Sequence, residues 1–187
     1  GTRRVSSLMV PMMISNMASG IVAIRNDCRG SAMPSVTACA SGSNAIGEAM
    51  RLIRHGYADA VITGGTEAAI TPCGVAGFIN MQALSTAEKV DEASLPFDKR
   101  RKGFVIGEGS VILILEEMEH AIKRGAKIYG EVCGYGSTCD AYHITAPHPE
   151  GRGGAMAMIN ALKEGSYSIE DKLYINAHGT GTPLNDK

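Results

Sequence analysis

The chain has 187 residues, of which 44% are hydrophobic, 20% charged and 5% aromatic, and its formal net charge is −1. This composition is typical of a folded globular protein and excludes a disordered chain or a fibre. The balanced charge gives no electrostatic reason to expect a nucleic acid or an anionic membrane surface as partner. The longest apolar run in the middle of the chain, Val111 to Leu115, is far too short to cross a bilayer.

Helical and strand-like patterns alternate along the chain. In chain order they predict a helix over 15–29, a strand over 34–38, a helix over 43–55, a strand over 59–63, a short helix over 78–84, a strand over 109–116, a helix over 117–124, a strand over 127–134, a helix over 154–164 and a strand over 173–177. This order indicates an α/β architecture with largely buried strands, in which ligands bind at the carboxyl ends of the strands.

Cys39 lies between the strand expected over 34–38 and the N-terminus of the next helix. The unpaired N–H groups and positive dipole at a helix start favour a thiolate over a thiol. Gly42 is expected to allow a sharp turn that points the sulfur into a cavity. A buried structural cysteine is the alternative. The other four cysteines lack this setting, and an odd number of cysteines without a CxxC pair indicates a reducing, cytoplasmic compartment.

His178 lies at the end of the strand expected over 173–177 and is followed by Gly179-Thr180-Gly181-Thr182-Pro183. An imidazole in this position suits general acid–base chemistry or hydrogen-bond donation. The two glycines permit close approach of an extended ligand, and the threonine hydroxyls can bond its polar groups. A histidine bonded only to the backbone is the alternative. Since both strands are expected to end on one side of the core, Cys39 and His178 are expected to meet there.

The remaining histidines and glycines indicate no metal or nucleotide site. His55 is expected to end a helix, and His120 is expected to face solvent from a helix. His143 and His148 share a loop, but their spacing fits no familiar zinc pattern. The glycines around Phe104 follow neither GxGxxG nor the P-loop pattern.

Two motifs together point to one family. They are Thr37-Ala38-Cys39-Ala40-Ser41-Gly42 and Asn176-Ala177-His178-Gly179-Thr180-Gly181-Thr182-Pro183. With them, the chain resembles the elongating β-ketoacyl-[acyl-carrier-protein] synthases, the condensing enzymes of fatty acid synthesis. The resemblance implies a thiolase-like α/β fold, with helices layered around mixed five-stranded sheets, that is only partly present here. Residues 1–126 would form the later part of its first half, and residues 127–187 the beginning of its second half.

The resemblance also implies roles for individual residues. Cys39 resembles the nucleophile that takes the acyl chain as a thioester, and its own N–H resembles an oxyanion-hole donor. His178 resembles the first of two histidines that assist decarboxylation of the malonyl group. Contacts to the phosphopantetheine arm are implied for Thr145, Thr180 and Thr182, and walls of the acyl pocket for Phe78 and Phe104.

The implied activity is the decarboxylative Claisen condensation of an acyl chain on Cys39 with malonyl-acyl carrier protein. The implied partners are the acyl carrier protein, with its phosphopantetheine-linked acyl and malonyl groups, and a second copy in a homodimer. No metal, other cofactor, nucleic acid or membrane is implied. A chain that begins at Gly1 and ends at Lys187, just past the histidine motif, is expected to be an internal piece of a longer protein. Because the family's second histidine, its lysine and its second oxyanion donor would lie downstream, the isolated chain is expected to be inactive.

Two alternatives stay open. A ketosynthase domain of a polyketide synthase shares Cys39 and the His-Gly-Thr-Gly-Thr run. The residues after Cys39, Ala-Ser-Gly-Ser-Asn-Ala-Ile-Gly, resemble the stand-alone fatty acid enzymes more closely. A non-catalytic chain-length partner subunit has the same fold, but such proteins typically lose the cysteine.

Overall fold

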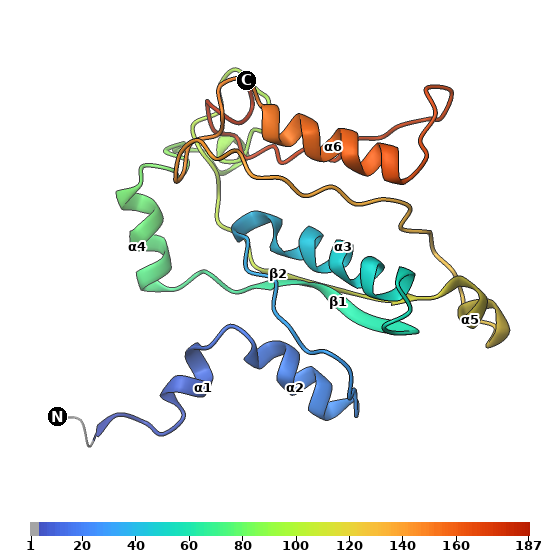
Figure 1. Ribbon diagram of the computed structural model, residues 1–187. Coiled ribbons are helices and arrows are strands. Elements are labelled where there is room, and N and C mark those ends of the chain that lie inside the picture. Colours follow the sequence, from blue (N-terminus) through green and yellow to red (C-terminus); the bar gives the residue numbers. More distant parts are fainter. Residues whose placement is uncertain (1–3) are drawn as a thin grey trace. The chain divides into compact units, whose positions relative to one another are not determined.

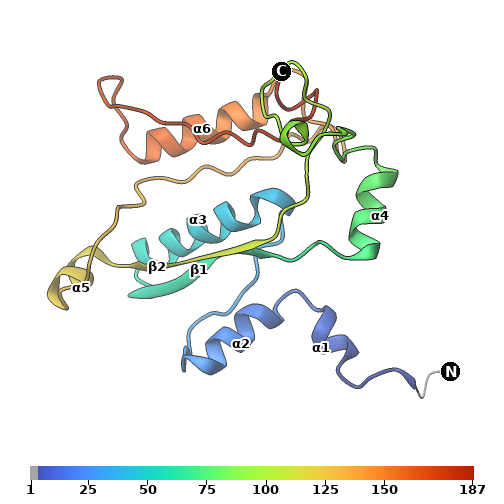
Figure 2. The ribbon, with the colours of Figure 1, turned by 180° about the vertical axis from the view of Figure 1, so that it is seen from behind.

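The computed structural model describes residues 4–187, which divide into two compact units (Figure 1, Figure 2). Unit 1 comprises the described residues up to Gly65 together with Ile112–Tyr129, and unit 2 comprises Thr66–Val111 and Gly130–Lys187. Within residues 4–187, every helix falls short of the length and apolar character that a bilayer crossing requires.

The helices of unit 1 are α1 (Met9–Met13), α2 (Met17–Arg25), α3 (Ser41–Arg54), α5 (Met118–Lys123) and the short 3₁₀ helix η2 (Ala38–Ala40). Strands β1 (Ala60–Glu67) and β2 (Gly109–Glu116) form a two-stranded sheet. The Glu117 N–H donates to the Asp59 carbonyl over 2.9 Å, so the start of β1 lies beside the end of β2 and the strands run antiparallel. Helix α3 lies along this sheet in both views (Figure 1, Figure 2).

The core of unit 1 is small. Its buried residues include Ala49 and Met50 of α3, Thr63 of β1 and Ala121 of α5. Helix α3 ends at Arg54, and Gly56 follows with a φ of 72° in the left-handed region, where a glycine is favoured. The helix end expected at His55-Gly56 is therefore confirmed.

Unit 2 contains α4 (Pro72–Asn80), the short 3₁₀ helix η3 (Val90–Glu92) and α6 (Arg152–Glu164). Helix α6 packs against the extended segment that holds Gly134 and Gly136. A Cβ on these glycines would collide with the carbonyl oxygens of Ala161 and Ala157 in α6, respectively. Only a residue without a side chain lets the backbone lie this close to a helix.

The expected helices are present with adjusted ends, and β2 has the expected bounds. Of the helix expected over 78–84, only residues 78–80 are helical, as the end of α4, which begins at Pro72; the rest of that prediction is wrong. The Thr71 side chain accepts a hydrogen bond from the Gly74 N–H, and proline fits the first turn. This Thr-Pro signal was missed in the sequence, as was α1.

The strands expected over 34–38, 127–134 and 173–177 are wrong, because these segments join no ladder among residues 4–187. A strand needs a neighbour to satisfy its backbone groups. Apart from the isolated parallel bridge between Leu84 and Phe104, β1 with β2 is the one ladder among the described residues. The sheet among the described residues therefore has two strands. The prediction that the strands are largely buried is also wrong for β2, where Val111 and Ile114 are each 69% exposed. Two strands provide few neighbours to cover their side chains.

Candidate active site

Cys39 lies in η2, which leads directly into α3. The expected position before a helix N-terminus is confirmed, although an extended segment rather than a strand precedes it. The thiol is free and exposed, so the alternative of a buried structural cysteine is wrong. Exposure does not distinguish Cys39, because all five cysteines are exposed and outside any disulfide. Cys73, in the first turn of α4, has a helix N-terminus of its own, contrary to expectation.

The turn that presents Cys39 is made at Ala38, whose φ of 49° is uncommon for a residue with a side chain. Hydrogen bonds of the Ser41 and Asn44 side chains hold this turn. The Thr37 N–H donates to Ser41 Oγ over 2.8 Å, and Ser41 Oγ donates to the Ala38 carbonyl over 2.8 Å. Asn44 Nδ2 donates to Thr37 Oγ1 over 2.7 Å. Ser41 and Asn44 therefore brace the cysteine turn, a role the sequence analysis missed, although polar side chains near a helix start are the usual signal for it.

Gly42 does not make the sharp turn that was expected of it. Gly42 belongs to helix α3, and its φ is not positive. Instead, Gly42 lies against β1, where a Cβ on it would stand 3.5 Å from the Cα of Gly65. The glycine thus permits a close approach between helix and strand, while Ala38 supplies the change of direction.

His178 in unit 2 is exposed and begins a tightly turned loop. Gly179 and Gly181 have φ values of 55° and 75°, which L side chains rarely adopt. Gly181 is buried, and its carbonyl accepts a hydrogen bond from the Gly103 N–H over 3.1 Å. The glycines therefore serve the turn itself, in addition to the ligand approach expected of them.

The hydroxyls of Thr180 and Thr182 lie 2.8 Å apart, within hydrogen-bond distance, and both residues are half-buried. Thr145 lies in another loop of unit 2 and is exposed. Its N–H and that of Ala146 donate to His143 Nδ1 over 3.1 and 3.0 Å. His143 thus organises the Thr145 loop by accepting two backbone hydrogen bonds at Nδ1. In residues 4–187, no three His, Cys, Asp or Glu side chains are grouped so that they could hold a metal ion.

Phe78 and Phe104 meet edge to face, with ring centroids 5.4 Å apart and planes at 81°. Phe104 also lines an apolar pocket of about 250 Å³. Its other lining residues are Ile70, Val75, Leu84, Ser85, Val105 and Ile106. The Phe104 N–H donates to the Ala83 carbonyl over 3.1 Å, which fixes the ring-bearing segment beside 83–85. A concave site with such a lining suits a hydrocarbon chain.

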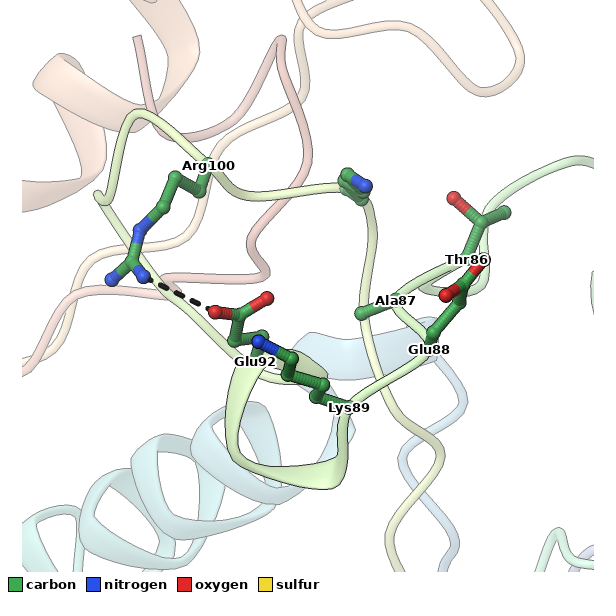
Figure 3. Close-up of a pocket in the computed structure, with 7 residues that line it drawn as sticks. Thr86, Ala87, Glu88, Lys89, Glu92 and Arg100 are labelled. Carbon is green, nitrogen blue, oxygen red and sulfur yellow. Dashed lines mark ion pairs between the residues drawn. The ribbon is translucent and has the colours of Figure 1, made fainter.

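A second pocket of unit 2, of about 310 Å³, is polar and contains none of the expected site residues (Figure 3). It is lined by Thr86, Ala87, Glu88, Lys89, Glu92, Arg100 and Lys102. The Arg100 guanidinium points toward Glu92, 3.6 Å away, and also pairs with Asp98 over 3.0 Å. The side-chain hydrogen bond from Arg100 is the main reason that the pKa of Asp98 is lowered to about 2. The pocket lining thus mixes three cationic side chains with two carboxylates.

The chain matches two models of one known protein family. Residues 1–121 match the family model described as the β-ketoacyl synthase N-terminal domain, and residues 129–187 match the model for the C-terminal domain of the same family. The chain belongs to the β-ketoacyl synthase family.

Curated relatives of this β-ketoacyl synthase chain include two enzymes that share one name. The chain is 60% identical over 187 residues to the 3-oxoacyl-[acyl-carrier-protein] synthase 2 of Synechocystis sp. (strain ATCC 27184 / PCC 6803 / Kazusa). It is 52% identical over 186 residues to the Staphylococcus aureus protein of that name. All of this chain is covered in both matches, but only 45% and 46% of the relatives. The chain therefore spans less than half the length of these proteins.

Solved structures show the same fold. The chain matches AntDE:AntF, described as a type II polyketide acyl-carrier protein in complex with its ketosynthase bound to the hexaketide, with a TM-score of 0.92 and 39% identity. It matches a β-ketoacyl synthase from Burkholderia phymatum STM815 with a TM-score of 0.88 and 38% identity. These matches cover 97% of this chain and 45% and 44% of the solved chains, respectively. The expected thiolase-like ketosynthase fold is therefore confirmed, with part of it present here.

Proposed function

We propose that this β-ketoacyl synthase chain carries part of the active site of a fatty acid elongation enzyme. The enzyme would condense an acyl chain held on Cys39 with malonyl-acyl carrier protein to give β-ketoacyl-acyl carrier protein. The proposal is carried by the 60% identity, over the whole chain, to a 3-oxoacyl-[acyl-carrier-protein] synthase 2. The lower identity of 39% to the solved polyketide complex makes a polyketide ketosynthase the second candidate.

Cys39 is the proposed nucleophile. Its sulfur would attack the thioester carbonyl of the acyl carrier, forming a new thioester on Cys39 and releasing the carrier's thiol. The exposed position of Cys39 at the start of α3 supports this role, because the helix N-terminus favours negative charge on the sulfur and on the oxyanion of the intermediate. The Cys39 N–H is the proposed oxyanion donor.

His178 is the proposed hydrogen-bond donor for the second step. Loss of carbon dioxide breaks a carbon–carbon bond of the malonyl group and leaves its electron pair in a thioester enolate. A donor N–H at the enolate oxygen lowers the barrier to this step. The enolate carbon would then attack the Cys39 thioester, expelling the cysteine sulfur as the new bond forms. Cys39 lies in unit 1 and His178 in unit 2, and we expect the sulfur and the ring to lie about 3–5 Å apart in the intact synthase.

The remaining expected residues are proposed to bind the substrate. The half-buried hydroxyls of Thr180 and Thr182, with that of Thr145, would contact the phosphopantetheine arm. Phe78 and Phe104 would contact the acyl chain, a role supported by their edge-to-face packing and by the apolar pocket beside Phe104.

Two macromolecular partners are proposed. The first is an acyl carrier protein, which one matched structure contains together with its ketosynthase. The second is another copy of the synthase. Helices α1 and α2 have no buried residues and expose Met12, Met13 and Ile24 at 73%, 70% and 82%. Association would cover this apolar surface.

We also propose a reducing, cytoplasmic compartment, which is supported by five cysteines outside any disulfide. Residues 1–126 and 127–187 would belong to the two successive halves of the thiolase-like fold.

The test measures thioester formation and carbon dioxide release separately in the intact synthase that contains this chain. Cys39→Ala is expected to abolish acylation and condensation but to leave some malonyl decarboxylation. His178→Ala should leave acylation intact and slow decarboxylation by roughly 10²–10³-fold, the usual effect of one lost donor. Cys28→Ala, which removes another exposed thiol, is the control. The isolated 187-residue chain should catalyse neither full reaction. Normal carbon dioxide release by His178→Ala would remove His178 from this step.

A further inference from the structure

Ser41 begins α3, and its side chain reaches back to the turn that presents Cys39. Its hydroxyl is bonded on both sides: Ser41 Oγ accepts a hydrogen bond from the Thr37 N–H and donates one to the Ala38 carbonyl, each over 2.8 Å. The Ser41 N–H bonds to the same carbonyl. Two donors of one residue thus fix the direction in which the Ala38 carbonyl points.

The Ala38 carbonyl and the Cys39 N–H belong to one peptide group. A peptide group is planar, and in its trans form the C=O and the N–H point in opposite directions. The bond between these two residues is trans. By fixing the Ala38 carbonyl, Ser41 therefore also fixes the direction of the Cys39 N–H, which is the proposed oxyanion donor.

The backbone at Ala38 needs such support. Its φ of 49° is uncommon for a residue with a side chain, and this conformation persists where surrounding contacts hold it. The methyl group of Ala38 can form no hydrogen bond, so neighbouring polar groups hold the turn. Ser41 bonds the Ala38 carbonyl. One turn further along α3, Asn44 Nδ2 donates to Thr37 Oγ1 over 2.7 Å and holds the residue before Ala38.

The same hydrogen bonds strengthen the donor as well as orient it. They form a chain from the Thr37 N–H, through the Ser41 hydroxyl, to the Ala38 carbonyl. Hydrogen bonds in a chain polarise one another, so a peptide group whose carbonyl accepts a bond has a more polar N–H. Ser41 is half-buried, which limits competition from water. The Cys39 N–H is thus directed and polarised before a substrate binds.

We propose that Ser41 is a positioning residue for acyl transfer: its hydroxyl orients and polarises the Ala38–Cys39 peptide, so that the Cys39 N–H is directed at the oxyanion that forms when an acyl thioester is attacked. It acts through the backbone and not on the sulfur. This role rests on the proposed function, which assigns the oxyanion to the Cys39 N–H. Decarboxylation is assigned to His178, so the two steps should respond differently to loss of the Ser41 hydroxyl.

The test compares Ser41→Ala with Ser41→Thr in the intact synthase. Alanine removes the hydroxyl and favours a helix, so α3 should be retained. Threonine keeps a hydroxyl that can accept from the Thr37 N–H and donate to the Ala38 carbonyl. Ser43→Ala removes an exposed serine hydroxyl from the same turn of α3 and is the matched control.

The rates to measure are acylation of Cys39 from an acyl carrier protein, malonyl decarboxylation, and alkylation of Cys39 by iodoacetamide, a reaction that forms no oxyanion. Ser41→Ala should slow acylation by roughly 10–100-fold, because the donor N–H remains but is misdirected. Decarboxylation and alkylation should stay within about twofold, since neither uses this donor. Ser41→Thr should restore acylation to within about threefold of the unsubstituted enzyme, and Ser43→Ala should leave all three rates unchanged.

Four results would overturn the proposal. Unchanged acylation in Ser41→Ala would show that the hydroxyl does not direct the donor. Equal loss of acylation and alkylation would place the effect at the sulfur, and equal loss of acylation and decarboxylation would indicate a general loss of structure. A Ser41→Thr variant as impaired as alanine would show that the hydroxyl is not the group responsible. Failure of the unsubstituted enzyme to acylate Cys39 would instead contradict the proposed function.

Discussion

A Cβ on Gly65 of β1 would stand 3.2 Å from the Cα of Gly42 in the first turn of α3. Strand and helix thus approach more closely than a side chain at Gly65 allows without a shift. We expect Gly65→Ala to lower the free energy of unfolding by about 1–3 kcal/mol through overpacking.

Gly42→Ala is the matched control for this substitution, because its Cβ would make an ordinary contact of 3.5 Å with Gly65. Since alanine also favours a helix, this variant should stay within about 1 kcal/mol of the unsubstituted chain. Urea unfolding measures the free energy of unfolding of both variants. Equal losses in the two would contradict the expectation that only Gly65→Ala overpacks the contact.

Cys39 is expected to be the cysteine that is alkylated fastest at neutral pH. All five thiols are exposed, so exposure alone predicts similar rates. Cys39 lies in η2, two residues before the first residue of the 14-residue α3, while Cys73 lies in the first turn of the 9-residue α4 and is the closest competitor. Competitive alkylation followed by mass spectrometry ranks the sites. A faster reaction at Cys28, Cys73, Cys133 or Cys139 would count against Cys39 as the nucleophile.

Glu116 should make the stability of unit 1 depend on pH in the acid range. Arg124 donates two hydrogen bonds of 2.6 Å to its carboxylate, and His120 Nδ1 lies 2.5 Å from it. His120 is thus bonded to Glu116, rather than only facing solvent as expected. The hydrogen bond from Arg124 is the main reason that the pKa of Glu116 falls from 4.5 to about 2.

Because this pKa is lower in the folded state, the carboxylate contributes its full stability above about pH 4.5, and the contribution is lost as the pH falls toward 2. Glu116→Gln should lower the urea midpoint at pH 7 and flatten its decline between pH 5 and 3. Glu119→Gln, on the same helix, is the control. If the urea midpoint of Glu116→Gln declined with acid as steeply as that of the unsubstituted chain, the decline would not originate in Glu116.

Gly136→Ala should destabilise unit 2 by about 1–3 kcal/mol, because the new methyl group would collide with the Ala157 carbonyl in α6. Gly130→Ala has nothing within 4 Å of its Cβ and provides the comparison. Hydrogen exchange of the α6 amides, measured in both variants, localises the effect. Equal protection in the two would show that α6 does not pack against Gly136.

The features that sequence patterns predicted correctly are those that depend on interactions between near neighbours in the chain. The end of α3 at Gly56, the bounds of β2 and the placement of Cys39 before a helix follow from periodicity, turn residues and capping, which act over a few residues. The two motifs around Cys39 and His178 were sufficient to indicate the family, because their residue types and order are unusual.

Tertiary structure alone decided which segments have partners. The residues 34–38 and 173–177 have strand-like sequences but join no ladder in the part of the chain that the structure describes, whereas the buried Asp186 gains Phe97, distant in sequence, as a hydrogen-bond donor. Likewise, Gly42 looked like a turn residue, yet its use is the contact with Gly65. These features all depend on contacts between residues far apart in the chain: strand pairing, burial of a carboxylate and close glycine contacts. A local sequence pattern does not specify which distant residue makes such a contact.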